Sequence, residues 1–88
     1  MFVWDDEKAR FNSSKHGVSF ERAVEVFFDP FAKLVDTSRN DEAREALIGV
    51  DFDLNLLYVA HVSFEAETRI RIISARPASG AERKAYED

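Results

Sequence analysis

The sequence predicts an α+β fold in which an antiparallel sheet carries helices on one face. Three observations predict this class: two helical stretches open the chain, short apolar runs separated by polar turns fill its middle, and a capped helix closes it. Strands that are joined by short turns pair antiparallel. We therefore predict the element order β-α-α-β-β-β-β-α within a single domain that spans residues 1–88.

The first part of the chain is predicted to hold a short strand and a helix. Residues 2–4 form an apolar run, and Asp5 and Asp6 are suited to cap the free N–H groups of a helix over residues 6–14. This helix should stop at Gly17, because glycine can take the positive φ that ends many helices.

A second helix is predicted after Ser19, which is an N-cap candidate. It should end at Asp29, since Pro30 pushes the preceding residue out of the α region. Its apolar residues recur at helical spacing, and we expect all of them in the core: Phe20, Ala23, Val24, Phe27 and Phe28.

The strands and the last helix follow. The expected segments are an edge strand at 34–35, a polar loop at 37–45, and strands at 46–50, 56–64 and 68–75. Pro77 closes the last strand. Ser79 and Glu82 match a capping box, which predicts a short helix that runs to about Glu87.

Charge is distributed unevenly in a chain with a formal net charge of -5. Residues 1–58 hold seven Lys/Arg against twelve Asp/Glu, whereas residues 59–88 hold five of each. The last third can therefore meet a polyanion locally, although the chain as a whole repels one. The sequence has no cysteine and no long apolar run, so we predict that the chain has no disulfide and no membrane-spanning segment. We therefore expect a soluble, cytoplasmic protein.

Alternation along the last two strands gives the first candidate site residues. Arg69 and Arg71 share one face of their strand, while Ile70 and Ile72 share the other. His61 lies on the preceding strand, so it can stand across from an arginine if the register allows. A shift of that register by one residue would place His61 on the opposite face from the arginine.

The chain after the last strand adds further candidates. Arg76 ends the strand, and Glu82, Arg83 and Tyr86 lie on the helix that follows. Guanidinium groups bind phosphate oxygens in pairs and keep their charge at physiological pH, so this set is suited to a phosphate ligand. Structural alternatives stay open: the strand arginines can pair with Glu65 or Glu67, and Arg76 with Glu82 can form a salt bridge that ties the helix to the sheet.

The order of several short motifs resembles the BrnT toxin family. The first is Trp4, Asp5, Lys8 and Ala9; the second is Lys15 to Glu21 with Ala23; the third is Phe27, Asp29 and Pro30; the last are Arg69 to Arg76 and then Glu82, Arg83 and Tyr86. Each motif is weak alone, but together they cover nearly the whole chain in the family's order.

The resemblance implies a RelE-like fold and a ribonuclease toxin of a bacterial type II toxin–antitoxin pair. It implies that RNA is the substrate and that neither a metal nor a cofactor is needed. It also implies a BrnA-like antitoxin as partner, and the toxin would contact DNA only indirectly, through this antitoxin. A higher-order toxin–antitoxin assembly is a further possibility. In such an enzyme the 2′-hydroxyl of RNA attacks the neighbouring phosphorus, which needs a base, a cation and an acid.

Roles follow for the candidate residues. We expect Arg76, with Arg69 or Arg71, to bind the phosphate and stabilise the transition state, and His61 to act as base or acid. Glu82 is a candidate base or an orienter of Arg76, and Tyr86 a candidate acid or stacking surface. Candidate RNA-binding residues are Lys15, His16 and Arg83. We expect the catalytic groups to converge on one phosphodiester. The alternative is a catalytically silent homologue that only binds the antitoxin.

Overall fold

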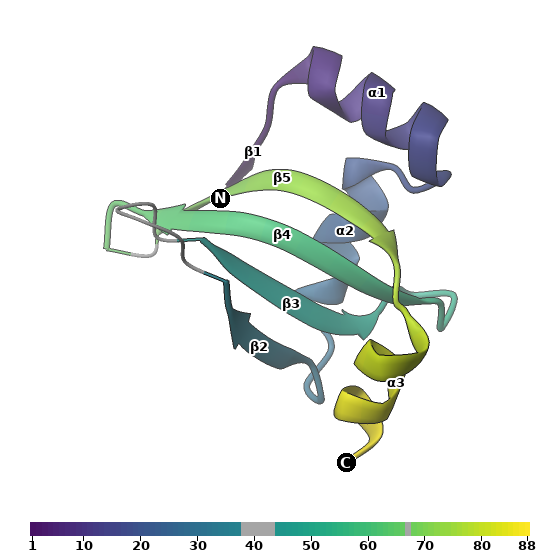
Figure 1. Ribbon diagram of the computed structural model, residues 1–88. Coiled ribbons are helices and arrows are strands. Elements are labelled where there is room, and N and C mark those ends of the chain that lie inside the picture. Colours follow the sequence, from purple (N-terminus) through teal and green to yellow (C-terminus); the bar gives the residue numbers. More distant parts are fainter. Residues whose placement is uncertain (38–43, 67) are drawn as a thin grey trace.

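A computed structural model describes residues 1–37, 44–66 and 68–88, and it shows one sheet with helices on both of its sides (Figure 1). In chain order the elements are β1 (Phe2–Val3), α1 (Asp6–His16), α2 (Phe20–Val26), β2 (Lys33–Asp36), β3 (Glu45–Val50), β4 (Leu56–Phe64), β5 (Arg69–Pro77) and α3 (Gly80–Glu87). The predicted class and element order are confirmed. The expectation that all helices lie on one face of the sheet is wrong, because α3 lies on the face opposite α2.

The sheet has five strands in the order β1-β5-β4-β3-β2. The strands β2 to β5 pair antiparallel with their neighbours, as their short connections predict, and β1 adds to the edge of β5 in parallel. The ladder between β4 and β5 is shifted at Ala60 and His61, where one extra residue on β5 forms a bulge.

Helix α2 packs behind the sheet and α3 lies in front of one end of it, while α1 runs alongside β5 (Figure 1). The main core lies between α2 and the sheet. Its buried members are Val18, Phe20, Ala23, Val26, Leu57, Val59, Ile72 and Ala75. On the other face, Ala46 and Ile48 of β3 are buried near α3.

Helix α1 has the predicted caps and is two residues longer than predicted. The Asp5 carboxylate accepts the N–H of Lys8, and Gly17 takes the left-handed conformation with φ of 70°. Asn12 joins this helix to the sheet. Its amide nitrogen donates to the carbonyls of Val18 and Ala75, and its oxygen accepts the N–H of Ala75, so one buried side chain satisfies the backbone edge of β5.

Helix α2 begins at the predicted cap, Ser19, but ends at Val26, earlier than predicted. The prediction that Val24 and Phe28 belong to the core is wrong. Val24 is only partly buried and is not part of the core cluster. Because the helix ends at Val26, the Phe28 ring turns outward, where it is 66% exposed. The helix approaches β3 closely at Gly49, where a Cβ atom would lie 2.9 Å from Val26 Cγ1. A side chain at position 49 would therefore separate the two elements.

The strands and the last helix lie close to their predicted positions. β4 has the predicted bounds, β2 and β3 begin one residue earlier, and β5 extends to Pro77. The predicted polar loop at 37–45 falls mainly outside the described residues. The capping box is confirmed, since Ser79 accepts the N–H of Glu82 while the Glu82 carboxylate accepts the N–H of Ser79.

Candidate functional site

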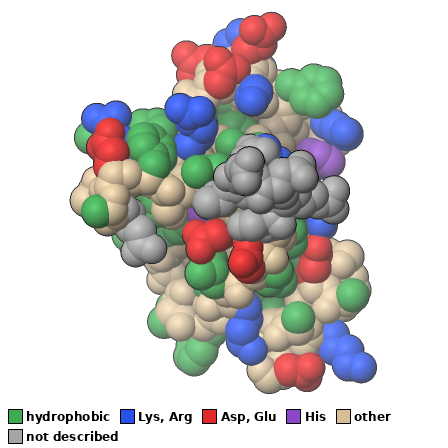
Figure 2. All heavy atoms as spheres, turned by 60° about the vertical axis from the view of Figure 1, so that its left-hand side comes forward, with side chains coloured by type: hydrophobic (Ala, Val, Ile, Leu, Met, Phe, Trp, Pro, Cys, Tyr) green, Lys and Arg blue, Asp and Glu red, His purple; other side chains and the backbone are tan. Residues whose placement is uncertain are grey.

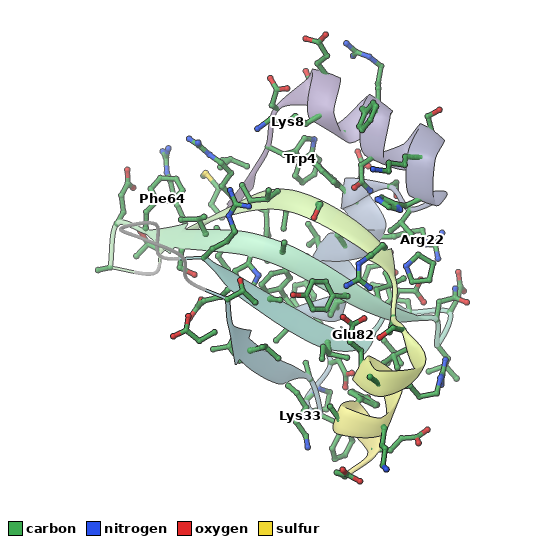
Figure 3. The ribbon with its side chains drawn as sticks, viewed as in Figure 1. Trp4, Lys8, Arg22, Lys33, Phe64 and Glu82 are labelled. Carbon is green, nitrogen blue, oxygen red and sulfur yellow. The ribbon has the colours of Figure 1, made fainter. Side chains whose placement is uncertain are left out.

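The face of β4 and β5 opposite α2 carries most of the predicted site residues. Side chains of paired residues point to the same face, so the register assigns each side chain. We call this surface the open face; it consists of Tyr58, Ala60, Val62 and Phe64 on β4 and Arg69, Arg71, Ser74 and Arg76 on β5. Figure 3 shows Glu82 on α3 at one end of this sheet and Phe64 at the other.

Arg76 is held in place at the α3 end of the open face. Its two terminal nitrogens donate to the two oxygens of Glu82 at 2.7 and 2.8 Å. Its guanidinium also lies over the ring of Tyr58, 4.2 Å from the centroid. This paired and stacked geometry leaves the side chain 37% exposed, so Arg76 is pre-oriented and still accessible.

The contact between Arg76 and Glu82 shifts the pKa of both side chains. The hydrogen bonds from Arg76 lower the pKa of the Glu82 carboxyl, and burial opposes this less strongly. The hydrogen bond to Glu82 in turn raises the pKa of Arg76. A carboxylate with a lowered pKa is a weak general base. The predicted structural salt bridge between helix and sheet is therefore confirmed, and the electrostatics favour an orienting role for Glu82 over a basic one.

Tyr86 does not reach the open face. Its hydroxyl donates to Asp29 Oδ2 at 2.7 Å, which raises the pKa of Tyr86. Lys33 binds the same helix, since its ammonium group donates to the carbonyls of Ala85 and Asp88. These contacts fix α3 against β2 and the end of α2. Tyr86 thus anchors the helix that carries Glu82.

Arg69 and Arg71 lie on the open face, as predicted from alternation, but far from Arg76. At roughly 3.3 Å per residue, Arg71 is about 16 Å from Arg76 along β5. Arg69 pairs with Glu65 at 3.3 Å, which is one of the structural alternatives that the sequence leaves open. Arg71 lies 5.8 Å from the centre of the Phe64 ring. The strand arginines and Arg76 cannot share one phosphate.

His61 lies on the opposite face of the sheet, and the expectation that it stands across from an arginine is wrong. It pairs with Ile72, packs edge-on against Phe27 with ring centres 4.9 Å apart, and is 2% exposed. Its Nδ1 lies 3.2 Å from the Val59 carbonyl oxygen, and its Nε2 lies 3.5 Å from Glu45 Oε1. The sheet separates this imidazole from Arg76, so the expected convergence on one phosphodiester is not found.

The three predicted RNA-binding residues divide into two groups. Lys15 lies on the exposed side of α1, 5.8 Å from the centre of the Phe11 ring. His16 and Arg83 instead line one pocket, between the end of α1 and the start of α3. The structure therefore brings together two residues that are 67 positions apart in the sequence.

Tyr58 is a site residue that the sequence-based reasoning did not single out. Its ring supports Arg76, and its hydroxyl makes no hydrogen bond with any residue that the structure describes. The signal for it was present in the alternation of β4, which places Tyr58 on the face away from His61. The missing information was the partner, because only the strand register pairs Tyr58 with Arg76.

The molecular surface is mixed in charge. On the side that Figure 2 shows, blue basic groups stand apart, separated by acidic and hydrophobic ones, and form no continuous patch among the described residues. The described residues also contain no group of three or more His, Asp or Glu side chains placed to hold a metal ion. None of the helices in the described segments has the length and apolar character needed to cross a bilayer.

Comparison with known proteins identifies the family. Residues 4–82 match the family described as the ribonuclease toxin, BrnT, of type II toxin–antitoxin systems. The chain belongs to the BrnT family. The predicted resemblance is confirmed.

A solved structure supports the same conclusion. The crystal structure of the Brucella abortus ribonuclease toxin BrnT matches with a TM-score of 0.72 and 30% sequence identity, over 90% of this chain and 97% of that one. No curated protein sequence gives a significant match. As a BrnT toxin of a type II system, the chain has an antitoxin partner. The family match includes Arg76, Glu82 and Tyr58, and it ends before Arg83 and Tyr86.

Proposed function

We propose that this BrnT-family chain is an endoribonuclease that cleaves RNA without a metal ion, at the Arg76 end of the open face. The observation that carries the proposal is the paired and stacked geometry of Arg76. Its guanidinium is fixed by Glu82 and Tyr58 yet remains exposed on a sheet face that α1 and α2 leave uncovered. A pre-oriented cation of this kind stabilises charge that develops in a transition state.

The proposed reaction is an attack of the 2′-oxygen on the adjacent phosphorus. The bond from phosphorus to the 5′-oxygen breaks, which yields a 2′,3′-cyclic phosphate and a 5′-hydroxyl end. Arg76 binds the non-bridging phosphate oxygens through the N–H groups that Glu82 does not use. Arg76 is thus the catalytic residue, and Glu82 is a positioning residue that acts through it.

Two proton transfers complete the proposed reaction. The Tyr58 hydroxyl makes no hydrogen bond to any described residue, and its ring adjoins Arg76. We therefore assign Tyr58 the role of the general acid that donates a proton to the leaving 5′-oxygen. The proton of the 2′-hydroxyl passes to solvent water, because both Glu82 oxygens are bound to Arg76 and the lowered pKa of Glu82 makes it a weak base. Arg71 and Arg69 contact the RNA strand farther along the open face.

The proposed partner that silences this site is a BrnA-like antitoxin, through which alone the toxin would reach DNA. Contact with the open face is the direct route to inhibition, because Arg76 then loses access to RNA. We also propose that residues 1–88 act as one toxin domain and that the toxin and antitoxin form a higher-order assembly. His61 has no place in the proposed site; its burial assigns it to packing.

The decisive experiment combines end mapping with one substitution. The purified chain is incubated with RNA in EDTA, and we expect cleavage that leaves 2′,3′-cyclic phosphate or 3′-phosphate ends. Arg76→Ala should reduce the rate by about 10²- to 10³-fold, the loss typical of one transition-state donor. Lys84→Ala, which removes an exposed charge elsewhere on α3, should leave the rate unchanged. Ends that carry a 3′-hydroxyl would rule out the 2′-attack route.

A second candidate function follows from the charge distribution. The net charge is -5, and Arg76 is already neutralised by Glu82, so a chain that only binds its antitoxin fits the same structure. RNA affinity normally depends on cation–phosphate contacts. This candidate predicts no cleavage by the wild-type chain and a loss of antitoxin binding in Arg76→Ala.

A further inference from the structure

A pocket of about 280 Å³ lies outside the open face, between the end of α1, the turn before β4 and the start of α3. His16, Arg22, Arg83 and Asn55 are among the residues that line it. We propose that this pocket binds a phosphate group of the RNA strand at a position next to the cleaved one. The proposal rests on the proposed ribonuclease activity for the identity of its ligand.

The charge of the lining carries the first step. Every ionisable side chain that lines the pocket is basic, and no carboxylate is among the lining residues. This occurs in a chain whose net charge is -5, so a random surface hollow would more often include acidic groups. A concave site lined by one sign of charge concentrates ligands of the opposite sign.

The hydrogen-bond partners carry the second step. Arg22 is already used, since it donates to Asp51 Oδ2 at 2.9 and 3.1 Å and to the Gly17 carbonyl oxygen at 3.3 Å. The side chains of His16 and Arg83 make no hydrogen bond or ion pair with any described residue. An imidazole and a guanidinium therefore share one pocket with their donors free, which is the chemistry that binds a phosphate.

Position carries the third step. Pro77 and Ala78, which also line the pocket, directly follow Arg76 in the chain, and Arg83 directly follows Glu82. The pocket thus opens at the strand end where the open face stops. An RNA strand with one phosphate on Arg76 can continue over the end of β5 and place a neighbouring phosphate between Arg83 and His16.

The test uses probes that cannot be cleaved. The full chain is titrated with inorganic phosphate and with a 2′-O-methyl oligoribonucleotide, and binding is followed by NMR at the His16 ring and the Arg83 side chain. Both probes should shift these signals in a saturable manner. Unmoved His16 signals at saturating oligonucleotide would overturn the proposal.

Substitutions give the quantitative arm. Arg83→Gln should weaken the oligonucleotide about tenfold, as expected for one lost hydrogen-bonded charge, and should lower the slope of log affinity against log salt by about 0.7. His16→Gln should act in the same direction. The matched control is Arg10→Gln, an identical substitution at an exposed position of α1 outside this pocket. If Arg83→Gln and Arg10→Gln weaken oligonucleotide binding equally, the effect comes from overall charge, and the proposal is overturned.

The outcome is separable from that of the proposed function. A chain that cleaves no RNA can still bind both probes at this pocket, and a chain that cleaves RNA can leave the pocket empty. If Arg83→Gln weakens the antitoxin complex but leaves oligonucleotide affinity unchanged, the pocket receives an acidic side chain of the antitoxin, and its assignment to RNA is overturned.

Discussion

The Arg76 guanidinium and the Glu82 carboxylate form a two-fold hydrogen-bonded pair that joins the end of β5 to the first turn of α3. The same carboxylate closes the capping box by accepting the N–H of Ser79 at 2.8 Å. One side chain therefore fixes both the start of α3 and the direction of the arginine. This double duty makes Glu82 the residue through which α3 controls the proposed site.

The first prediction separates the two roles that Glu82 can play. Glu82→Gln keeps one acceptor oxygen for Arg76 but removes the charge, whereas Glu82→Ala removes both. If Glu82 mainly orients Arg76, Glu82→Gln should lose about tenfold in cleavage rate, and Glu82→Ala should approach the loss seen in Arg76→Ala. If Glu82 is instead an essential base, the two variants should be equally inactive. Single-turnover cleavage rates decide between these results.

The second prediction concerns His61, which the structure places in the core against Phe27. His61→Ala should lower the free energy of unfolding by about 2–4 kcal/mol, because it leaves a cavity of an aromatic ring's size. The cleavage rate of the folded fraction should stay within about twofold of wild type. Urea unfolding gives the first quantity and active-fraction kinetics the second. If the His61→Ala chain is stable but inactive, the imidazole takes part in catalysis and this prediction is contradicted.

Most of the fold was predictable because its signals are local. Asp5, Gly17, Ser19 and Ser79 mark helix ends through hydrogen bonds or backbone angles that depend on a few neighbouring residues. Strand alternation likewise assigned Arg69 and Arg71 to one face and Ile70 and Ile72 to the other. The exceptions are Val24, which lies outside the core cluster, and Phe28, whose place depended on the exact residue where the helix ends.

The site was less predictable because it depends on contacts between distant residues. Alternation placed His61 on the same strand face as Leu57 and Val59, which are buried. This shared face already indicated that His61 lies in the core. The register between β4 and β5, with its bulge at Ala60 and His61, then decided which residues meet. No local pattern reveals that Tyr58, and not His61, lies beside Arg76.

The third prediction concerns Asn12, whose side chain makes three hydrogen bonds to the backbone at Val18 and Ala75. Asn12→Ala should destabilise the chain by about 2–4 kcal/mol, because it leaves buried backbone groups without partners. Hydrogen exchange should show the largest loss of protection at the Ala75 amide. The exposed neighbour Ser13→Ala is the control and should change stability by less than about 0.5 kcal/mol. Equal effects of the two substitutions would contradict the linking role of Asn12.

The fourth prediction concerns acid stability and rests on Asp51. Burial raises the pKa of this carboxyl, but hydrogen bonds from Asn55, Arg22 and the Asp53 amide outweigh it, so the pKa lies below its ordinary value of 3.8. The unfolded chain therefore binds the proton more tightly than the folded one. The stabilisation by Asp51 is fully present above pH 3.8 and is lost as the pH falls through the lower folded pKa.

The measurement is urea unfolding between pH 2.5 and about 6. Wild-type stability should fall steeply at the acid end of this range, with contributions also from Asp29 and Glu82, whose pKa values are lowered in the same direction. Asp51→Asn should be less stable at neutral pH, because Arg22 loses a charged partner with which it shares two hydrogen bonds. Its stability should also depend less on pH below about 4, since one titrating carboxyl is gone. A pH dependence identical to that of wild type would show that Asp51 does not couple folding to protonation.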